Sequence, residues 1–431
     1  MKTRPVFISA SARTPFVKSL TTYADISTQE LMTAALEALV TKLRLEGKII
    51  DDVGLGAVIN NSLNWNLARE CVLGTKLDPH TPAYTLQRAC GTSLETTLQL
   101  ALKISNFQCE TGIAGGVDTN SDMPIMIQKS LAQKLLALRN ASSFTEKMKA
   151  ITSLRPADLK PLYPAVTEPR TGLSMGEHCE KMVKEWKITR DEQDQLALLS
   201  HQNGVKAYDE GFYDDLVIEF KGLKRDGTLR SDTSLEKLSK LKTVFDTSEL
   251  GTLTAGNSSP LTDGAAAVFL VSEEAAKESN YPILARFVDA QVAAIDFVHG
   301  DGLLMAPTIA VSELLKRNKL SLQDFDIYEI HEAFAGQVLC TLKAWESADY
   351  CKRVLKLDAP LGTIDRTKIN IKGGSVALGH PFAATGARIV GSLAKMLKQN
   401  GKGRGLISIC TAGGMGVAAI LEAVYGSLLS V

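Results

Sequence analysis

The sequence lacks the signatures of several common protein classes. None of its seven cysteines forms a CxxC pair, so neither a zinc site nor a disulfide framework is suggested and a reducing compartment is expected. No signal peptide or membrane-spanning apolar run is visible, which predicts a cytoplasmic protein. There is no Walker A loop and no clear dinucleotide fingerprint. A formal net charge of zero argues against nucleic acid as a partner.

What is present is an alternation of strand and helix patterns along 431 residues, which is enough for two or three packed domains. Ser27 and Glu30 form a capping-box signature at the start of one amphipathic helix. After about residue 280 the layout of the first part recurs. These patterns favour an α/β fold. Strands are predicted at residues 5–10, 53–59, 111–117, 216–221, 281–289 and 327–330, and helices at residues 28–43, 67–73 and 307–316.

Between residues 124 and 164 the pattern changes to basic amphipathic helices. Only Glu146 and Asp158 oppose the cations there, and apolar residues interleave with them. Four interpretations stay open: a solvated face that packs on the body, a membrane-surface contact, a partner contact, or a funnel for an anionic substrate. The cations are Lys129, Lys134, Arg139, Lys147, Lys149, Arg155 and Lys160.

Cys90 lies between an extended segment and a helix pattern. Gly91 allows a tight turn, and Thr92 and Ser93 are plausible helix caps. The amide groups and positive dipole end of a helix favour thiolate over thiol, and a thiolate is the form that attacks carbonyl carbon. For a lone cysteine, a buried structural role is the simpler alternative.

Three C-terminal stretches carry further reactive groups in glycine-rich settings. His331 ends a strand, and His380 precedes Pro381 near a helix N-terminus, whose dipole favours a neutral imidazole that can act as a base. Cys410 ends a buried strand before a glycine turn, and residues 417–425 form the predicted return strand. Each residue alone could be structural. Together they are the parts that acyl transfer through an activated nucleophile requires.

Ordered motifs along the whole chain resemble the thiolase family. They are ARTPF, RACGTS, AGGVDTNSD, SMGEHCEKM, TAGNSSPLTDGAAA, HEAFAGQ, GGSVALGHPFAATGAR and CTAGGMG. The resemblance implies a five-layered αβαβα fold of two similar α/β halves with an inserted, mostly helical loop domain. The implied division is residues 1–120 with 250–280, the insertion 121–249, and residues 281–431. HEAF in place of NEAF, with the basic insertion, is similar to the β-subunits of fatty-acid oxidation complexes.

The resemblance also implies the chemistry. Cys90 would be the acylated nucleophile, His380 its base, and Cys410 the acid/base at the substrate α-carbon. His331 would position the water of one oxyanion hole, and the backbone N–H groups of Cys90 and Ala412 would form the other. The implied activity is that of an acetyl-CoA C-acyltransferase: 3-ketoacyl-CoA and CoA give acetyl-CoA and a shortened acyl-CoA in β-oxidation. CoA thioesters are then substrates, and neither a cofactor nor a metal is expected.

For CoA itself, the resemblance implies that Arg230 contacts the adenine nucleotide and Ser259 the pantetheine, with Met175 beside the pantetheine or acyl chain. Ser174 stands where many short-chain members have histidine. Basic residues near the entrance could meet the CoA phosphates, although an ordinary solvated surface explains them equally well. These are Lys224, Arg225 and Lys242.

Assembly and alternatives follow from the same resemblance. A homodimer or larger assembly is expected, including a heterotetramer. The basic insertion at residues 125–165 would dock a hydratase/dehydrogenase α-subunit or a membrane surface. One alternative activity is that of a biosynthetic acetyl-CoA C-acetyltransferase that forms or cleaves acetoacetyl-CoA. A ketoacyl synthase ranks lower, because such enzymes lack a second catalytic cysteine. A non-catalytic lipid- or acyl-CoA-binding protein is the alternative from another class.

Overall fold

The two halves of the chain fold with the same order of strands and helices. The computed structural model describes residues 3–164 and 166–424. The first half contains β1 (Val6–Arg13), α1 (Thr28–Leu43), β3 (Asp52–Leu55), α2 (Leu67–Leu73), β4 (Ala83–Thr85), α3 (Thr92–Ser105), β5 (Thr111–Asp118) and β6 (Thr262–Ser272). The second contains β7 (Ala285–Ala294), α10 (Ala306–Asn318), β8 (Ile327–Ile330), α14 (Thr385–Asn400), β9 (Arg404–Thr411) and β10 (Met415–Glu422).

Hydrogen bonds join the strands of both halves in the order β4-β3-β5-β6-β1-β7-β10-β9-β8, and β2 (Val17–Lys18) pairs with β6. The halves meet where β1 pairs antiparallel with β7. Within each half the order corresponds, because β4 pairs parallel with β3 and a parallel bridge joins Ile369 to Tyr328 of β8. The recurring layout expected from the sequence is therefore a structural repeat.

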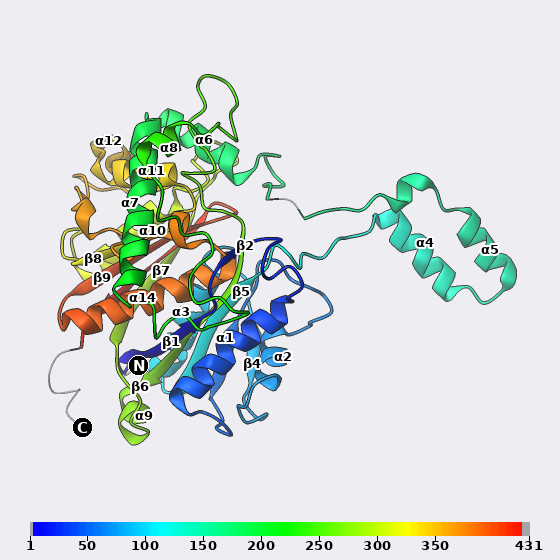
Figure 1. The fold of residues 1–431 in the computed structure, drawn as a ribbon, viewed down its shortest axis with the longest axis horizontal. Helices are drawn as coiled ribbons and strands as arrows, with labels where there is room; N and C mark the ends of the chain where they lie inside the picture. Colours follow the sequence, from blue (N-terminus) through cyan, green and yellow to red (C-terminus); the bar gives the residue numbers. More distant parts are fainter. Residues whose placement is uncertain (1–2, 165, 425–431) are drawn as a thin grey trace.

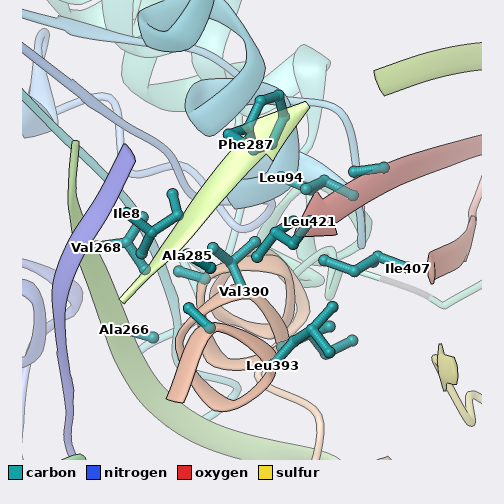
Figure 2. Close-up of a cluster of buried hydrophobic side chains, with 14 of the residues drawn as sticks. Ile8, Leu94, Ala266, Val268, Ala285, Phe287, Val390, Leu393, Ile407 and Leu421 are labelled. Carbon is teal, nitrogen blue, oxygen red and sulfur yellow. The ribbon is translucent and has the colours of Figure 1, made fainter. Parts of the chain in front are cut away.

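Alternation of side chains along the central strands produces five layers. Inner-facing residues of β6 and β10 pack with α3 and α14 in a shared central layer, part of which is drawn in Figure 2. Outer-facing residues of β6 pack with α1, and those of β10 pack with α10. The inner set is Ala266, Val268, Leu270, Val417, Ala419 and Leu421, and the outer set is Ala265, Ala267, Phe269, Val271, Ala418 and Ile420. The helix–sheet–helix–sheet–helix arrangement matches the predicted fold.

Helices α3 and α14 approach closely in the central layer. A Cβ added to Gly386 of α14 would lie 2.4 Å from the backbone nitrogen of Leu94, so only glycine fits there without displacement. The Ala387 N–H donates to Ser93 Oγ at 2.8 Å, which fixes the register of the two helices. This contact matters because Cys90 precedes α3 and His380 precedes α14.

The segment between β5 and β6 has two parts. Helices α4 (Lys129–Asn140) and α5 (Phe144–Thr152) form an arm that projects away from the two halves (Figure 1). Backbone hydrogen bonds in both directions between Met126 and Leu162 close the base of this arm. Helices α6 (Met175–Glu185), α7 (Arg190–Asp209) and α8 (Leu235–Ser239) lie over the second half (Figure 1), where α6 packs with α11 (Ala335–Glu346). No helix in the described ranges has both the length and the apolarity to cross a bilayer.

Three strand predictions need correction or restriction. Strand β3 ends at Leu55 rather than at residue 59, because the amides of Val58 and Ile59 turn to donate to Asp118. Residues 216–221 form no strand; Val217 makes a single bridge to Arg13 before the chain turns. The return strand ends at Glu422, and its predicted last residue, Tyr425, lies outside the described residues, as does the remainder of the C-terminal half.

Candidate active site

Cys90 occupies a tight turn between β4 and α3. Ala89, directly before it, has φ of 43°, a left-handed conformation that is strained for alanine and is typical of functional turns. Thr92 Oγ1 donates to the Ala89 carbonyl at 2.7 Å and accepts the Arg88 N–H at 2.9 Å, so its hydroxyl holds the turn closed. The predicted cap role of Thr92 and Ser93 is wrong, since the N-cap of α3 is Gly91 and makes no side-chain cap bond.

His380 lies against Cys90, with 3.3 Å between Nε2 and Sγ. Thr385 Oγ1 is 2.6 Å from the other ring nitrogen, Nδ1, and the His380 backbone N–H donates to Thr262 Oγ1 at 2.7 Å. The ring is therefore held from both ends of the imidazole and from the main chain. Nε2 is placed to accept the thiol proton of Cys90.

His331 follows β8 and packs on His380 with ring centroids 4.1 Å apart. Its side chain is fully buried, and Nδ1 lies 2.9 Å from Ser375 Oγ. Nε2 is buried and has no hydrogen-bond partner among the described residues, although it lies in the same cluster as Cys90 Sγ. The structure thus brings Cys90, His331 and His380 together, as predicted.

Cys410 is the penultimate residue of β9 (Arg404–Thr411) and lies beside the same cluster. Its thiol has a pKa well above the usual value, chiefly because it is buried and also because the Cys90 sulfur lies nearby. The backbone N–H groups of Ala412 and of Cys90 itself act on the Cys90 sulfur and favour its ionised form, which lowers its pKa. Gly413 and Gly414 have φ of 75° and 67°, the left-handed values that the turn after Ala412 requires. Two sulfur atoms, two imidazoles and two directed amides therefore share one site.

Burial decides the protonation of the resting site. It raises the pKa of the Cys90 thiol to about 12, and the two amides only partly offset it. The pKa of His380 is lowered to about 3 by burial and by the Arg388 charge. The amides favour thiolate, as expected from the sequence, but loss of solvation outweighs them and the thiol is the resting form. His380 is a neutral base as predicted, for reasons of burial and charge.

Two carboxylates that support the site were missed by the sequence analysis. Asp118, fully buried at the end of β5, accepts backbone N–H groups of Val58, Ile59 and Ala383, which ties the His380 loop to the first half. Glu168 accepts the Gly413 N–H at 2.7 Å and so holds the turn that contains Ala412. Asp118 stands within the AGGVDTNSD motif, which was a usable signal, whereas nothing local marks Glu168.

The residues predicted to contact CoA differ in how close they lie to the cluster of Cys90, His331 and His380. Ser259 is beside it, since its Oγ and backbone N–H both donate to the Ala333 carbonyl, two residues after His331. Met175 begins α6 and packs on the core cluster that contains Cys410. Arg230 is exposed and lines a surface hollow with His201, whose Nδ1 accepts the Arg230 backbone N–H.

The remaining predicted contacts have other partners within the chain. Ser174 caps α6 through a capping box with Glu177. Lys224 pairs with Glu219 at 3.2 Å and Arg225 with Asp209 at 2.9 Å, while Lys242 is exposed. These ion pairs are on the surface and would exchange readily for a phosphate group. The roles of all these residues toward CoA stay predictions.

The Cys90, His331 and His380 side chains also offer one possible metal-ligand atom each within 4.8 Å of one another. A thiolate and two imidazoles would suit a soft divalent cation, but such an ion would occupy the nucleophile. The absence of a metal therefore stays a prediction from the sequence.

Comparisons with known proteins find matches to a single family over nearly the whole chain. The family model of the thiolase N-terminal domain matches residues 6–274, and that of the thiolase C-terminal domain matches residues 281–423. The chain is 40% identical to a 3-ketoacyl-CoA thiolase of Aliivibrio fischeri, over 97% of this chain and 95% of the relative. A 3-ketoacyl-CoA thiolase of Pectobacterium carotovorum is 40% identical over 97% of this chain and 96% of its own length.

Solved structures share the fold. The acetyl-CoA acetyltransferase of Bacillus anthracis superposes with a TM-score of 0.80 at 30% identity, covering 98% of this chain and 100% of its own. Human mitochondrial 3-ketoacyl-CoA thiolase gives the same TM-score, identity and coverage.

Proposed function

The chain belongs to the thiolase family, and from that premise we propose that it cleaves 3-ketoacyl-CoA with CoA through an acyl group carried on Cys90. The activity is that of a 3-ketoacyl-CoA thiolase, an acyltransferase. The observation that carries the assignment of residues is the 3.3 Å contact between the Cys90 sulfur and His380 Nε2. A buried thiol needs a base at that distance, because burial holds its proton.

The first half-reaction forms the acyl-enzyme. Cys90 transfers its proton to His380 Nε2, and the sulfur attacks the keto carbon of the substrate. The bond between the α- and β-carbons breaks, and its electron pair stays on acetyl-CoA as an enolate. The thiol of Cys410 gives its proton to that α-carbon, after which the His380 imidazolium returns a proton to Cys410. A second donor is needed, since the Cys90 sulfur is occupied by the acyl group.

The second half-reaction releases the product. CoA gives its thiol proton to His380 and attacks the acyl group, and the Cys90 thiolate leaves and regains the proton. Both half-reactions place negative charge on an oxygen. The amides of Cys90 and Ala412, now aimed at the Cys90 sulfur, would serve one such oxygen, and His331 the other. Backbone donors suit this role because they do not reorganise during the reaction.

Acyl-enzyme trapping tests the proposal. Wild-type protein mixed with a 3-ketoacyl-CoA in the absence of CoA should release a burst of acetyl-CoA and gain the mass of one acyl group. Cys90→Ser should show neither, whereas Cys71→Ser, a buried core cysteine distant from the site, should behave like wild type. Unchanged turnover in Cys90→Ser would overturn the mechanism.

The likeness to an acetyl-CoA acetyltransferase supports a second candidate activity, the formation or cleavage of acetoacetyl-CoA. The residues that perform the chemistry would be the same. Thiolysis rates over a series of ketoacyl chain lengths separate the two candidates. A role in β-oxidation predicts that chains longer than acetoacetyl are cleaved at comparable or higher rates, and the alternative predicts a sharp fall.

For substrate binding, we propose that CoA runs from Ser259 past Met175 to Arg230, with Lys224, Arg225 and Lys242 able to meet its phosphates. The support is that Ser259 lies beside the reactive cluster while Arg230 lines an exposed hollow. All seven cysteines are free, which supports a reducing compartment such as the cytoplasm.

Assembly as a homodimer or larger is proposed on the open end of the sheet. β4 is a terminal strand of the sheet order, and nearby Trp65 and Leu63 are 95% and 83% exposed. An uncovered edge with large apolar side chains beside it is unfavourable in a monomer. Light scattering after size-exclusion chromatography should give at least a dimer. A monomer at all concentrations would contradict the proposal.

The arm is proposed to dock a hydratase/dehydrogenase subunit or a membrane surface. Its support is a surface that is apolar and basic at once, with Phe144 79% exposed at the start of α5. Co-purification with such a subunit at low salt, and co-sedimentation with anionic vesicles, distinguish the two partners. An isolated homomer that binds neither would overturn the docking role. Further exposed apolar residues of the arm are Ile125, Met126, Ile127, Leu136, Ile151, Leu159 and Tyr163.

A further inference from the structure

Behind His331, a buried chain of polar groups runs through Ser375 to Arg388. We propose that Ser375 and Arg388 are positioning residues that hold His331 in the neutral tautomer protonated at Nε2, so that this nitrogen donates a hydrogen bond into the site. The use of that donor in catalysis rests on the proposed function. The tautomer itself follows from the hydrogen-bond chain alone.

Arg388 sets the donor–acceptor direction of the hydrogen bonds that run through Ser375 to His331. An Arg388 Nη2–H donates to Ser375 Oγ at 2.7 Å, and a guanidinium can only donate. Ser375 Oγ therefore accepts from Arg388. Its own hydroxyl proton then has one neighbour to which it can go, the His331 Nδ1 at 2.9 Å. If Nδ1 carried the ring proton instead, the Ser375 hydroxyl proton would have no acceptor among the described residues. Nδ1 therefore accepts that proton, which leaves Nε2 as the protonated nitrogen of a neutral ring.

Arg388 is fixed in the position from which it donates. It lies on α14, buried, with its guanidinium 3.7 Å from the carboxylate of Glu329 on β8. Glu329, two residues before His331, is also buried. Because the pair joins the strand that precedes His331 to the helix that follows His380, the hydrogen-bonded groups are held by both elements.

This tautomer requires that the His331 ring is neutral, and the surroundings of the ring keep it neutral. Burial, the neighbouring His380 and the Arg388 charge together lower the pKa of His331 well below its usual value. An imidazolium would donate from both nitrogens, so the Ser375 oxygen would accept from both His331 and Arg388 and the serine's own proton would lose its acceptor. The charge that orients the serine therefore also disfavours protonation of the ring.

His380 has the opposite arrangement. Its Nδ1 faces the hydroxyl of Thr385, and its Nε2 must be unprotonated to accept the Cys90 proton at 3.3 Å. The two imidazole rings, packed at an interplanar angle of 49°, thus present one acceptor and one donor to the same space. Since His331 Nε2 has no partner of its own, the ligand it fits is an oxygen acceptor, such as a substrate carbonyl or enolate oxygen or a water bound to it. A protonated Nε2 is not available to a metal ion.

Nitrogen NMR of the whole protein labelled with 15N-histidine reads the tautomer directly. The chain has six histidines, and a His331→Gln sample assigns the relevant signals. We expect wild-type His331 to show a protonated, pyrrole-like Nε2 and an unprotonated, pyridine-like Nδ1. Ser375→Ala should move these signals toward the other tautomer and lower kcat about tenfold with KM unchanged. The matched control is Ser392→Ala, a buried hydroxyl one turn along α14 from Arg388.

Three results would overturn the inference. The first is a wild-type His331 protonated at Nδ1, which needs no variant and so stands even if Ser375→Ala fails to fold. The second is an unchanged His331 spectrum in Ser375→Ala, and the third is an equal change in Ser392→Ala. An enzyme with the expected tautomer and no thiolysis would instead overturn the proposed function, so the two failures are distinguishable.

Discussion

At the residue scale, we expect Cys90 and Cys410 to serve different steps of the reaction, so that a variant can lose one step and keep the other. Cys410→Ala leaves Cys90 and His380 in contact, so acyl exchange between acyl-CoA and labelled CoA should persist. Carbon–carbon cleavage needs a proton at the α-carbon, and thiolysis should fall by a factor on the order of 10² to 10⁴. Loss of both reactions to the same extent would contradict the division of roles. Circular dichroism confirms that the variant is folded.

Asp118 gives a pH-dependent test at the same scale. Its pKa is raised to about 7, first by burial and also by Asp263, despite the amides that it accepts. The folded state therefore holds this proton more tightly than the unfolded chain does. The associated stability is present below the unfolded pKa and is lost as the pH rises through about 7.

Asp118→Asn removes this titration. The free energy of unfolding of wild type, relative to Asp118→Asn, should decrease by up to about 4 kcal/mol between about pH 4 and pH 8. Urea unfolding at several pH values measures the difference. A constant penalty is expected in the variant, because its amide nitrogen would face a backbone N–H. A difference that does not vary with pH would contradict the assignment.

The sequence identified the reactive residues better than their supports. Cys90 and Cys410 stand at strand–helix and strand–turn junctions, and His380 stands in a loop between helical segments. All three stretches are rich in glycine, a local pattern that is visible without coordinates. Ser375 and Arg388 matter through contacts with His331, 44 and 57 positions away in numbering, and no local pattern reports such contacts. The sequence indicated that backbone amides favour the Cys90 thiolate, but it did not show the extent of burial, which raises the pKa of the thiol more than the amides lower it.

At the scale of elements, the contact of α3 with α14 is the most sensitive to change. Gly386→Ala would place a methyl group 2.4 Å from the Leu94 backbone nitrogen, which cannot move without moving α3. We expect a loss of about 1–3 kcal/mol in the free energy of unfolding, with a fall in turnover as Cys90 and His380 separate.

The control for this variant is Gly204→Ala in α7. The nearest atoms to its new Cβ are the ends of the Leu229 and Leu378 side chains, at 2.9 and 3.2 Å, which can rotate away. Alanine also favours helix over glycine by about 1 kcal/mol. Chemical denaturation of both variants should therefore show a clear loss only in Gly386→Ala. Equal stability of the two would contradict close packing between α3 and α14.

Elements with their own local signals were predicted closely. The bounds of α1 and its Ser27–Glu30 capping box agree with the sequence pattern, as do α2 and β8. Errors arose where backbone groups serve a distant partner. Residues 56–59 leave the sheet to donate to Asp118, and residues 216–221 meet the edge of β1 at one point only.

At the scale of the whole molecule, the arm can be removed at its base. Because Met126 and Leu162 already exchange two backbone hydrogen bonds, an Asn-Gly turn could replace residues 127–161. The shortened protein should fold, keep thiolysis, and lose binding to the partner subunit or vesicles that the full chain binds. A raised KM for acyl-CoA that salt abolishes would instead indicate that the arm guides an anionic substrate.

The repeated layout of the two halves has a consequence for how the groups of the site are distributed between them. Corresponding junctions, one before α3 and one before α14, supply the sulfur of Cys90 and the imidazole of His380, which lie 3.3 Å apart. The two halves are therefore not equivalent: under the proposed mechanism, one half holds the nucleophile and the other holds the base. Neither half, produced by itself, would contain both Cys90 and His380, and turnover would require the two halves to associate.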